Sequence, residues 1–314
     1  MSTLRSAYYF FRLGRPLFLV GGVVFHMLGV SAALYAGHPL NWTALLLGQM
    51  AVTCTQLMTH YSNDYFDYEA DRANTTATYW SGGSRVLPEG LLPPQTALRG
   101  AKVFRGIAFA AIGILGVFIQ RSVWVIVLPL VGLVLAWDYS APPLRLHSRG
   151  AGELTVALIV PVLTPLVGYT FQTGVPGILP LLAAVPLAFL QVGMVLSVNL
   201  PDAAGDRLVE KRTLVLRLGP EGAARLYLAC LALAYLSLPF LAVLGLPPQV
   251  AAAALLPVLL AAWLAYRMAR GDWAEPGAWN SLAFWSVGLL VASAVLEAAA
   301  FLGWSPLSLI AQAG

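Results

Sequence analysis

The sequence predicts an all-α, polytopic membrane protein built as a bundle of nine transmembrane helices. Of its 314 residues, 59% are AVILMFWYC and only 10% are DEKR, whereas an ordinary soluble domain has roughly 45–50% apolar and about 25% charged residues. The mean hydropathy is +0.77. Because so few charged residues cannot cover a water-facing surface, lipid must cover the apolar side chains. This excludes a soluble enzyme and a disordered chain, and we expect residues 1–314 to form a single transmembrane domain.

The expected spans follow from the apolar runs, since a helix needs about 20 mostly apolar residues at 1.5 Å each to cross the hydrocarbon core. Every span must be a helix, because an open strand edge leaves backbone groups unpaired in lipid. The runs lie near 17–36, 43–62, 103–119, 123–140, 152–171, 178–198, 225–245, 249–268 and 282–303.

The charged residues predict the orientation. All of the 18 Lys and Arg residues except Arg121 fall on the N-terminal side of the expected spans, so the positive-inside rule places the N-terminus in the cytoplasm. All of the 14 acids except Glu297 lie on that side or at its membrane edge. We therefore expect a multi-pass protein of the cell membrane whose chemistry faces the cytoplasm. Topology also explains the basic pI, so no nucleic-acid partner is expected.

A first acidic cluster follows the second expected span. It reads Asn63-Asp64-Tyr65-Phe66-Asp67-Tyr68-Glu69-Ala70-Asp71. If the span continues as a helix, Asp64, Asp67 and Asp71 share one face, at i, i+3 and i+7. Three like charges this close favour a bound cation, and Mg²⁺ takes carboxylate oxygens and bridges them to substrate phosphates.

A second cluster, in the other long inner connection, repeats this spacing. Asn199, Asp202 and Asp206 are again separated by three and then four residues. An internal repeat that puts two acidic helix ends at the cytoplasmic mouth predicts that both face one cavity and that each carries metal. The alternative interpretation, solvated loop carboxylates, does not explain the repeated spacing.

Basic residues follow each cluster. Arg85 comes after the first, and Lys211 and Arg212 come after the second. Carboxylates with metal on one side and Arg or Lys on the other are the arrangement that grips a diphosphate. Positive-inside topology alone accounts for Arg217 and Arg225.

The histidines give weaker signals. His60 lies four residues before Asp64, so it could orient an acceptor or accept a proton, although a packing or polar supporting role is favoured. His26, His38 and His147 have no partner at metal-ligand spacing. The turn Ser81–Arg85 could present backbone N–H groups to a phosphate, but Gly-rich turns are common.

At these residues the sequence resembles the UbiA superfamily of intramembrane prenyltransferases. Its aspartate-rich motifs NDxxDxxxD and DxxxD are matched by residues 63–71 and 202–206. Within the superfamily, YSAPPLRLHSRGAGEL and NLPDAAGDRLVEKRTLVLRLG are most similar to the 1,4-dihydroxy-2-naphthoate polyprenyltransferases of menaquinone biosynthesis.

The resemblance implies an enzyme that transfers a prenyl group from a polyprenyl diphosphate to an aromatic acceptor, with two or more diphosphate-bridged Mg²⁺ ions. No protein partner is evident. Arg145 would replace a Lys that other branches carry in the loop after Tyr139. The implied metal ligands and catalytic residues are Asp64, Asp67, Asp71, Asp202 and Asp206. The implied substrate-binding residues are Asn63, Arg85, Tyr139, Arg145, Asn199, Lys211 and Arg212.

Two alternatives stay open. The same chemistry could act on chlorophyllide, homogentisate, 4-hydroxybenzoate or a lipid glycerol. A cation transporter is the non-enzymatic alternative, but none of the expected spans carries an acid near its centre, where conduction needs one.

Overall fold

The computed structural model describes residues 3–304, which contain helices and no strand. The first half of the chain forms α1 (Thr3–Leu13), α2 (Pro16–Tyr35), α3 (Trp42–Phe66), α4 (Tyr68–Ala73), α5 (Pro94–Ile114) with its π-helical extension η1 (Leu115–Ile119), α6 (Trp124–Asp138) and the 3₁₀ turn η2 (Leu146–Arg149). The second half forms α7 (Gly152–Leu158), the π-turn η3 (Ile159–Leu163), α8 (Thr164–Thr173), α9 (Ile178–Asn199), α10 (Ala203–Leu208), α11 (Leu214–Val243), α12 (Pro248–Leu255), α13 (Val258–Ala269), η4 (Asp272–Ala274) and α14 (Pro276–Phe301).

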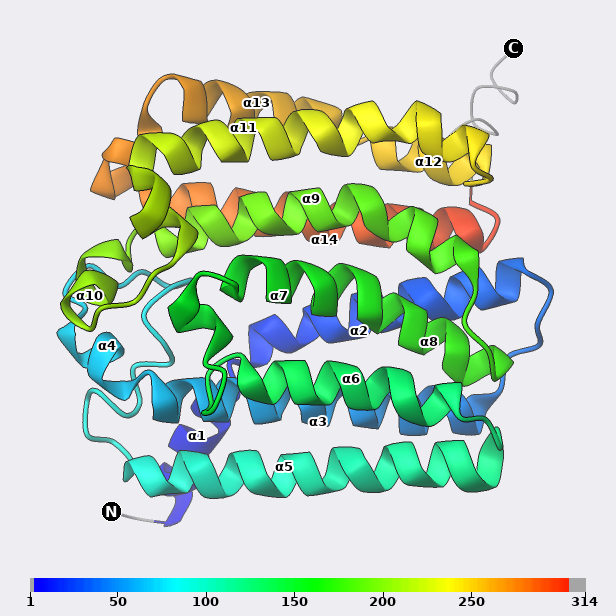
Figure 1. Ribbon diagram of the computed structural model, residues 1–314, viewed down its shortest axis with the longest axis horizontal. Helices are drawn as coiled ribbons and strands as arrows, with labels where there is room; N and C mark the ends of the chain where they lie inside the picture. The colour runs from blue at the N-terminus through cyan, green and yellow to red at the C-terminus, as the bar shows by residue number, and fades with distance from the viewer. Residues whose placement is uncertain (1–2, 305–314) are drawn as a thin grey trace.

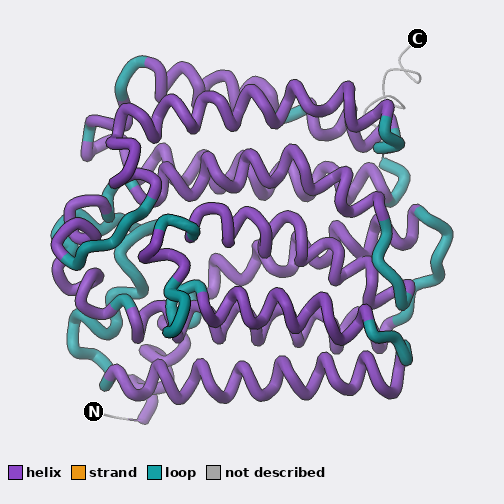
Figure 2. Tube along the Cα trace, in the orientation of Figure 1, coloured by secondary structure: helices purple, strands orange, loops and turns teal. Residues whose placement is uncertain are grey.

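The long helices run side by side, and their connections gather at the two ends of the bundle (Figures 1 and 2). In this bundle α3 packs along α5, α2 along α8 and α11 along α9. The short helices α4 and α10 touch each other at one end, on the left in Figure 1, together with the longest loops. This end of the bundle therefore consists of short helices and loops, whereas the rest consists of long helices.

Among residues 3–304, six helical segments are long and apolar enough to cross a membrane, or seven if the bent pair α12 and α13 forms one span. They correspond to α2, α5 with η1, α7 to α8, α9, α11 and α14. The other expected spans coincide with α3, which polar side chains interrupt, and with α6, which has 15 residues. Each expected run is thus helical, but length and composition alone support fewer spans than the nine expected.

Local sequence explains where helices begin and break. Proline occupies the first turn of α2, α5, α12 and α14, where the missing N–H costs nothing. Asn41 caps α3 by accepting a hydrogen bond from the N–H of Ala44 at 3.0 Å. Between α7 and α8, Pro161 and Pro165 lack N–H groups, and the hydroxyl of Thr164 donates to the carbonyl of Ile159 at 2.9 Å. The backbone N–H of Thr164 donates to the same carbonyl, so Thr164 closes the π-turn with two hydrogen bonds.

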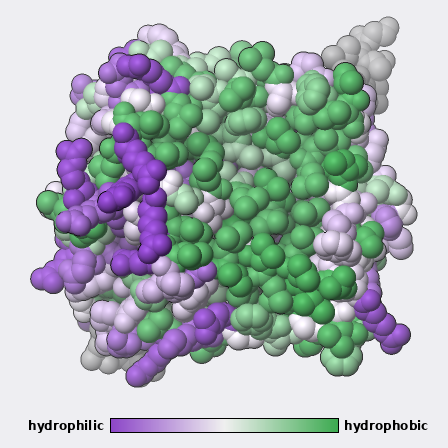
Figure 3. All heavy atoms as spheres, in the orientation of Figure 1, coloured by the Kyte–Doolittle hydropathy of each residue, from purple (hydrophilic) through white to green (hydrophobic). Residues whose placement is uncertain are grey.

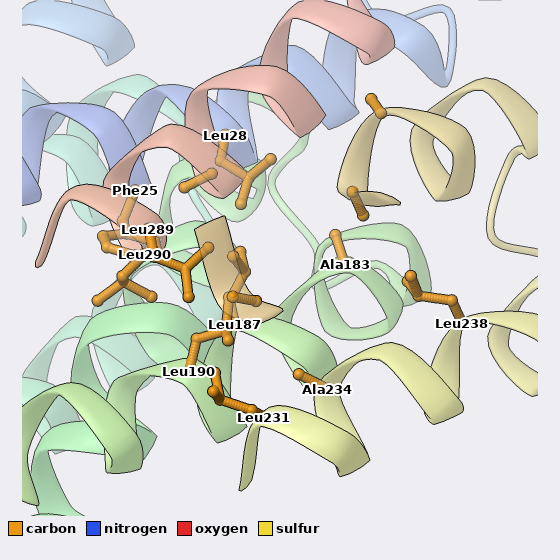
Figure 4. Packing of buried hydrophobic residues seen from close by; sticks show 14 of the residues in the cluster. Phe25, Leu28, Ala183, Leu187, Leu190, Leu231, Ala234, Leu238, Leu289 and Leu290 are labelled. Carbon is orange, nitrogen blue, oxygen red and sulfur yellow. The ribbon is translucent and has the colours of Figure 1, made fainter. Parts of the chain in front are cut away.

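The largest apolar core lies between α2, α9, α11, α12 and α14. Figure 4 shows Phe25 and Leu28 of α2 facing leucines of α9 and α14, and each of the two is at most 1% exposed. Outside this core, hydrophobic residues cover the middle of the molecular face in Figure 3, while hydrophilic residues gather at the end that carries α4 and α10. An apolar belt with one polar end is the arrangement expected for a protein embedded in lipid.

The crossing of α2 and α8 depends on Gly29. A methyl group added there would lie 1.8 Å from the carbonyl oxygen of Pro165 and 2.8 Å from the backbone nitrogen of Tyr169. We predict that Gly29→Ala lowers the free energy of unfolding by about 1–3 kcal/mol, because backbone atoms cannot yield as a flexible side chain does. The measurement is thermal unfolding in detergent, followed by circular dichroism.

The matched control lies on the same helix. Nothing lies within 4 Å of a methyl group added at Gly21, so Gly21→Ala should leave the melting temperature unchanged or raise it slightly. Equal behaviour of the two variants would contradict the close approach of α2 and α8.

Candidate active site

The two long connections meet over the polar end of the bundle. Asn74, which follows α4, donates to Asp202 Oδ1 at 2.6 Å, and the hydroxyl of Thr76 donates to the Pro201 carbonyl at 2.6 Å. The backbone N–H of Gly82 donates to Asp202 Oδ2 at 3.3 Å. Since these contacts join segments more than 100 residues apart in sequence, the two acidic clusters converge as the repeat predicted.

The repeat is also visible in local structure. Asp67 and Asp202 each immediately precede a helix of six residues, α4 and α10, and Asp71 and Asp206 lie within those helices. The expectation of one continuous helical face is wrong for the first cluster, because α3 ends at Phe66 and α4 begins at Tyr68. The break at Asp67 separates Asp64 from the other two carboxylates.

A cavity of about 130 Å³ lies between the two clusters, and we call it the inner cavity. Four of the five predicted aspartates line it, as do Asn63, Tyr139, Asn199 and Lys211. The complete lining is Arg15, Asn63, Asp67, Ala70, Asp71, Asn74, Trp80, Ser81, Gly82, Gly83, Tyr139, His147, Gly152, Glu153, Val198, Asn199, Asp202, Asp206, Lys211 and Thr213.

The remaining aspartate, Asp64, is buried beside the inner cavity and does not line it. Its carboxylate accepts hydrogen bonds from the backbone N–H and the hydroxyl of Ser84, and it lies 3.4 Å from a guanidinium nitrogen of Arg15. Asp64 therefore fastens the glycine-rich turn and Arg15 to the end of α3.

Asp67 stands at the centre of a charged network. One carboxylate oxygen lies 2.6 Å from His147 Nε2, and the other lies 2.9 Å from Lys211 Nζ, which is also 3.0 Å from Asp206 Oδ1. Burial alone would raise the pKa of Asp67, but Lys211 and His147 outweigh it and hold that pKa well below its ordinary range. Burial likewise lowers the pKa of Lys211, yet Asp67 and Asp206 together raise it above its ordinary value. Both groups are thus charged.

Asp71 and Asp202 lack such compensation. Burial, followed by the charges of Asp67 and Asp64, raises the pKa of Asp71 to about 8. Burial, followed by the charge of Asp206, raises the pKa of Asp202 to about 6. Burial also raises the pKa of Asp206, although Lys211 opposes it. The inner cavity therefore holds more carboxyl groups than its own cations compensate, and without a further cation the protonated form of Asp71 is favoured at neutral pH.

Glu153 adds to this excess. Its side chain is 2% exposed. One oxygen accepts from the N–H of Leu214 at 2.9 Å and from Asn199 at 3.1 Å, while the other oxygen is buried without a protein partner. Five carboxylates in the lining, Glu153 included, face two permanently charged cations, Arg15 and Lys211. A divalent cation fits this imbalance and this set of oxygen donors.

The carboxylates do not form a closed metal site by themselves. Within residues 3–304, no three His, Cys, Asp or Glu side chains converge closely enough to hold one ion. Metal bound here would need further oxygen ligands, and the phosphates of a substrate are such ligands.

A second cavity of about 540 Å³, which we call the outer cavity, adjoins the first. Asp67, Ala70 and Lys211 line both cavities, so they form a shared wall. The complete lining of the outer cavity is Phe66, Asp67, Glu69, Ala70, Arg145, Ser148, Arg149, Val209, Glu210, Lys211 and Arg212.

Three predicted substrate-binding residues lie elsewhere than expected. Arg145 and Arg212 line the outer cavity and not the inner one. Arg85 lines neither of these cavities, and its guanidinium donates to the backbone carbonyl of Asp71. Backbone geometry contributes for two of them, since Arg85 and Arg145 adopt left-handed conformations, with φ of 62° and 47°, that turn the chain sharply.

Sequence analysis missed His147 as a partner of the first cluster. Both ring nitrogens are engaged, Nδ1 at 2.6 Å from the carbonyl oxygen of Tyr139 and Nε2 at 2.6 Å from Asp67. The contact joins residues 80 positions apart, so local spacing carries no signal of it. His60, in contrast, lies 2.8 Å from the carbonyl oxygen of Gly14 and lines neither cavity, in line with a packing role.

Comparison with known proteins identifies the family. Residues 23–288 match the UbiA prenyltransferase family. The chain belongs to this family. It is therefore a prenyltransferase enzyme, and the transporter alternative is wrong.

Relatives and solved structures agree with this assignment. A curated relative named 1,4-dihydroxy-2-naphthoate octaprenyltransferase, from Bacillus subtilis, is 29% identical over 238 residues, which cover 74% of this chain and 73% of the relative. The Bacteriochlorophyll synthase 33 kDa chain of Cereibacter sphaeroides is 27% identical over 271 residues and 84% of both chains. A UbiA homolog from Archaeoglobus fulgidus, solved with GPP and Mg²⁺, shares the fold with a TM-score of 0.65 at 14% identity, covering 92% of this chain and 99% of that one.

The raised pKa of Asp71 predicts a pH-dependent stability. Its value in the folded protein is about 8, above the ordinary 3.8. Between these values the folded state binds a proton that the unfolded state has released, so the free energy of unfolding falls as pH rises through this window. Without divalent metal, we expect Asp71→Asn to be more stable than the parent at pH 8 by about 1–3 kcal/mol, the scale for relieving an unfavourable buried polar group.

Thermal unfolding with EDTA at pH 4, 6 and 8 measures this effect. The difference between Asp71→Asn and the parent should shrink from pH 8 to pH 4, where the folded state is protonated and the unfolded state is about half protonated. Glu89→Gln, at an exposed site outside both cavities, should follow the parent throughout. A variant less stable than the parent at pH 8 would show that Asp71 is well compensated after all.

Proposed function

We propose that this enzyme transfers a prenyl group from a polyprenyl diphosphate to 1,4-dihydroxy-2-naphthoate, in a reaction that depends on Mg²⁺ and serves menaquinone biosynthesis. The observation that carries this proposal is the inner cavity, where buried carboxylates in excess of cations adjoin an apolar bundle. The name of the Bacillus subtilis relative supports the acceptor. The Archaeoglobus fulgidus homolog was solved with GPP and Mg²⁺, which supports the metal and the class of donor.

In this proposal the two acidic clusters hold the metal. Mg²⁺, in two or more ions bridged by the diphosphate, would be held by Asp64, Asp67, Asp71, Asp202 and Asp206. Asn63 and Asn199 assist as neutral oxygen donors. When bound, Mg²⁺ neutralises the charge that develops on the diphosphate as the C–O bond breaks. Asp64 can bind metal only if its carboxylate releases the hydrogen bonds that it accepts from Ser84.

The chain's own cations and apolar surface serve the rest of the reaction. Lys211 and Arg15 line the inner cavity and would donate hydrogen bonds to the diphosphate oxygens. Tyr139 offers an aromatic ring against which a bicyclic acceptor can stack. The leucine-rich core beneath keeps water away from the allylic cation until the acceptor carbon attacks it.

We propose further that α3 and α6 also cross the membrane, which gives nine spans in a single domain of residues 1–314. Both helices pack against neighbouring spans, α3 along α5 and α6 along α8. In this proposal the N-terminus and both cavities lie on the cytoplasmic face of the cell membrane, which the distribution of Lys and Arg supports.

A second acceptor has specific support. The relative from Cereibacter sphaeroides is a bacteriochlorophyll synthase chain, which favours a chlorophyllide-type acceptor for the same metal-dependent chemistry. Homogentisate, 4-hydroxybenzoate and a lipid glycerol have no comparable support.

We predict that Asp67→Asn and Asp202→Asn each lower prenyl transfer by about 10²-fold or more, the scale for losing one preorganised electrostatic contact. Purified protein in detergent, a radiolabelled polyprenyl diphosphate and a panel of the acceptors above provide the assay, run with Mg²⁺ and with EDTA. Product should form with dihydroxynaphthoate and Mg²⁺ only.

Glu89→Gln, an exposed acid outside both cavities, is the matched control and should retain full activity. Product from another acceptor alone would overturn the menaquinone assignment and keep the mechanism. Full activity of Asp67→Asn or Asp202→Asn would overturn the metal assignment.

The proposed orientation predicts which loops a membrane-impermeant maleimide reaches in intact cells. Cys54 and Cys230 are buried, so the background is low. Val175→Cys, 54% exposed in the connection between α8 and α9, should react in intact cells. Glu210→Cys should react only after permeabilisation, and the reverse pattern would invert the topology.

A further inference from the structure

The outer cavity is surrounded by guanidinium groups that have no partner. Arg145, Arg149 and Arg212 line it, and within residues 3–304 none of their side chains forms an ion pair or a hydrogen bond. Glu69 and Glu210 also line it and are unpaired, while Lys211 and His147 already compensate Asp67. The three guanidinium groups outnumber these two unpaired glutamates, so the lining of the outer cavity has a net positive charge.

Backbone contacts fix the loops that carry these side chains. The N–H of Arg212 donates to the Ser148 carbonyl at 2.9 Å, which ties the loop before α11 to the loop after α6. Arg145 and Glu210 adopt left-handed conformations, with φ of 47° and 57°. Such conformations persist in non-glycine residues only where the surroundings enforce them, and they concentrate at binding sites.

The outer and inner cavities share a wall of three residues, Asp67, Ala70 and Lys211. Lys211 lines both, with its ammonium nitrogen 2.9 Å from Asp67 and 3.0 Å from Asp206. An anion that leaves the inner cavity past Lys211 enters a larger space rimmed by guanidinium groups. At the shared wall, a highly charged ion therefore meets the charged side chains of Asp67 and Lys211.

We propose that the outer cavity is a second anion site, which takes inorganic diphosphate as it leaves the inner cavity. This inference rests on the proposed function, in which the C–O bond of the donor breaks and both bonding electrons leave with the diphosphate oxygen. No further bond forms or breaks at the outer cavity. Guanidinium forks bind phosphoryl oxygens in pairs, and the ammonium of Lys211 completes the path between the two sites.

The chemistry of the lining favours diphosphate over the carboxylate of an aromatic acceptor. One carboxylate satisfies one guanidinium, whereas a diphosphate offers oxygens to several. Among the described residues that line the outer cavity, Phe66 supplies the one aromatic ring, which is little surface for a bicyclic ligand.

The first experiment measures binding of ³²P-labelled inorganic diphosphate to the purified full chain in EDTA. Without metal, the carboxylates of the inner cavity repel diphosphate, so the outer cavity is the site observed. We expect the double variant Arg145→Gln/Arg212→Gln to bind at least tenfold more weakly. Arg225→Gln, which removes an exposed arginine paired with Glu221, is the matched control and should bind as the parent does.

The second experiment measures inhibition of prenyl transfer by added diphosphate. The double variant should need at least tenfold more diphosphate for the same inhibition, with the KM values of donor and acceptor unchanged. Thermal unfolding checks that the variant is folded. The charge-preserving variant Arg145→Lys/Arg212→Lys should recover part of the affinity, because a point charge remains where the fork is lost.

The outcomes separate this inference from the proposed function. If the double variant binds diphosphate and is inhibited by it as the parent is, the outer site is overturned, even if transfer proceeds as proposed. A raised KM for the carboxylated acceptor with unchanged diphosphate inhibition assigns the arginines to the acceptor and also overturns it. If no acceptor is prenylated while binding still depends on the arginines, the proposed function fails and the anion site stands.

Discussion

The burial of carboxylate charge at one end of an apolar bundle is the constraint on which the rest of this structure depends. Several acids lie in a small cavity where water cannot solvate them fully, so each needs a partner from the protein or from a ligand. Asp67 has two partners, Lys211 and His147. Asp71 and Asp202 have less compensation, and their pKa values rise accordingly, to about 8 and about 6. This imbalance underlies our proposal that the inner cavity binds divalent cations together with an anion.

Close packing of the helices holds the loops that carry these carboxylates in fixed positions. Close crossings such as that of α2 and α8 at Gly29 let broken, proline-containing helices pack as tightly as regular ones. The polar loops that close the active-site end are anchored to helix termini, as when Asp64 at the end of α3 holds Ser84. Apolar helix packing thus borders directly on a hydrogen-bonded polar end, which matches the apolar tail and charged head of the prenyl diphosphate that we propose as donor.

The inner and outer cavities share a wall that contains the ion-paired Lys211, and the charges of their linings differ. The inner cavity is rich in carboxylates and suits metal with diphosphate, whereas the outer cavity is rimmed by arginines and suits an anion without metal. Lys211 belongs to both, bound to Asp67 and Asp206. The loop from Tyr139 to Arg149 joins the two, because it carries His147 inward and Arg145 outward.

The amino-acid sequence by itself determined the membrane class, the helical character of each apolar run and the convergence of two aspartate clusters, because composition and residue spacing are local properties. It also determined that Asn63, Tyr139, Asn199 and Lys211 belong with them, since each lies close in sequence to a cluster or to the motif that revealed the family. Tertiary structure alone decided that the helix ends before Asp67 and that Asp64 accepts a hydrogen bond from Ser84. It also decided that His147 and Glu153 line the inner cavity, whereas Arg145 and Arg212 line the outer one. The physical reason is that these placements depend on contacts between distant segments and on left-handed turns, which are set by how the loops pack on the finished bundle and not by the spacing of residues along the chain.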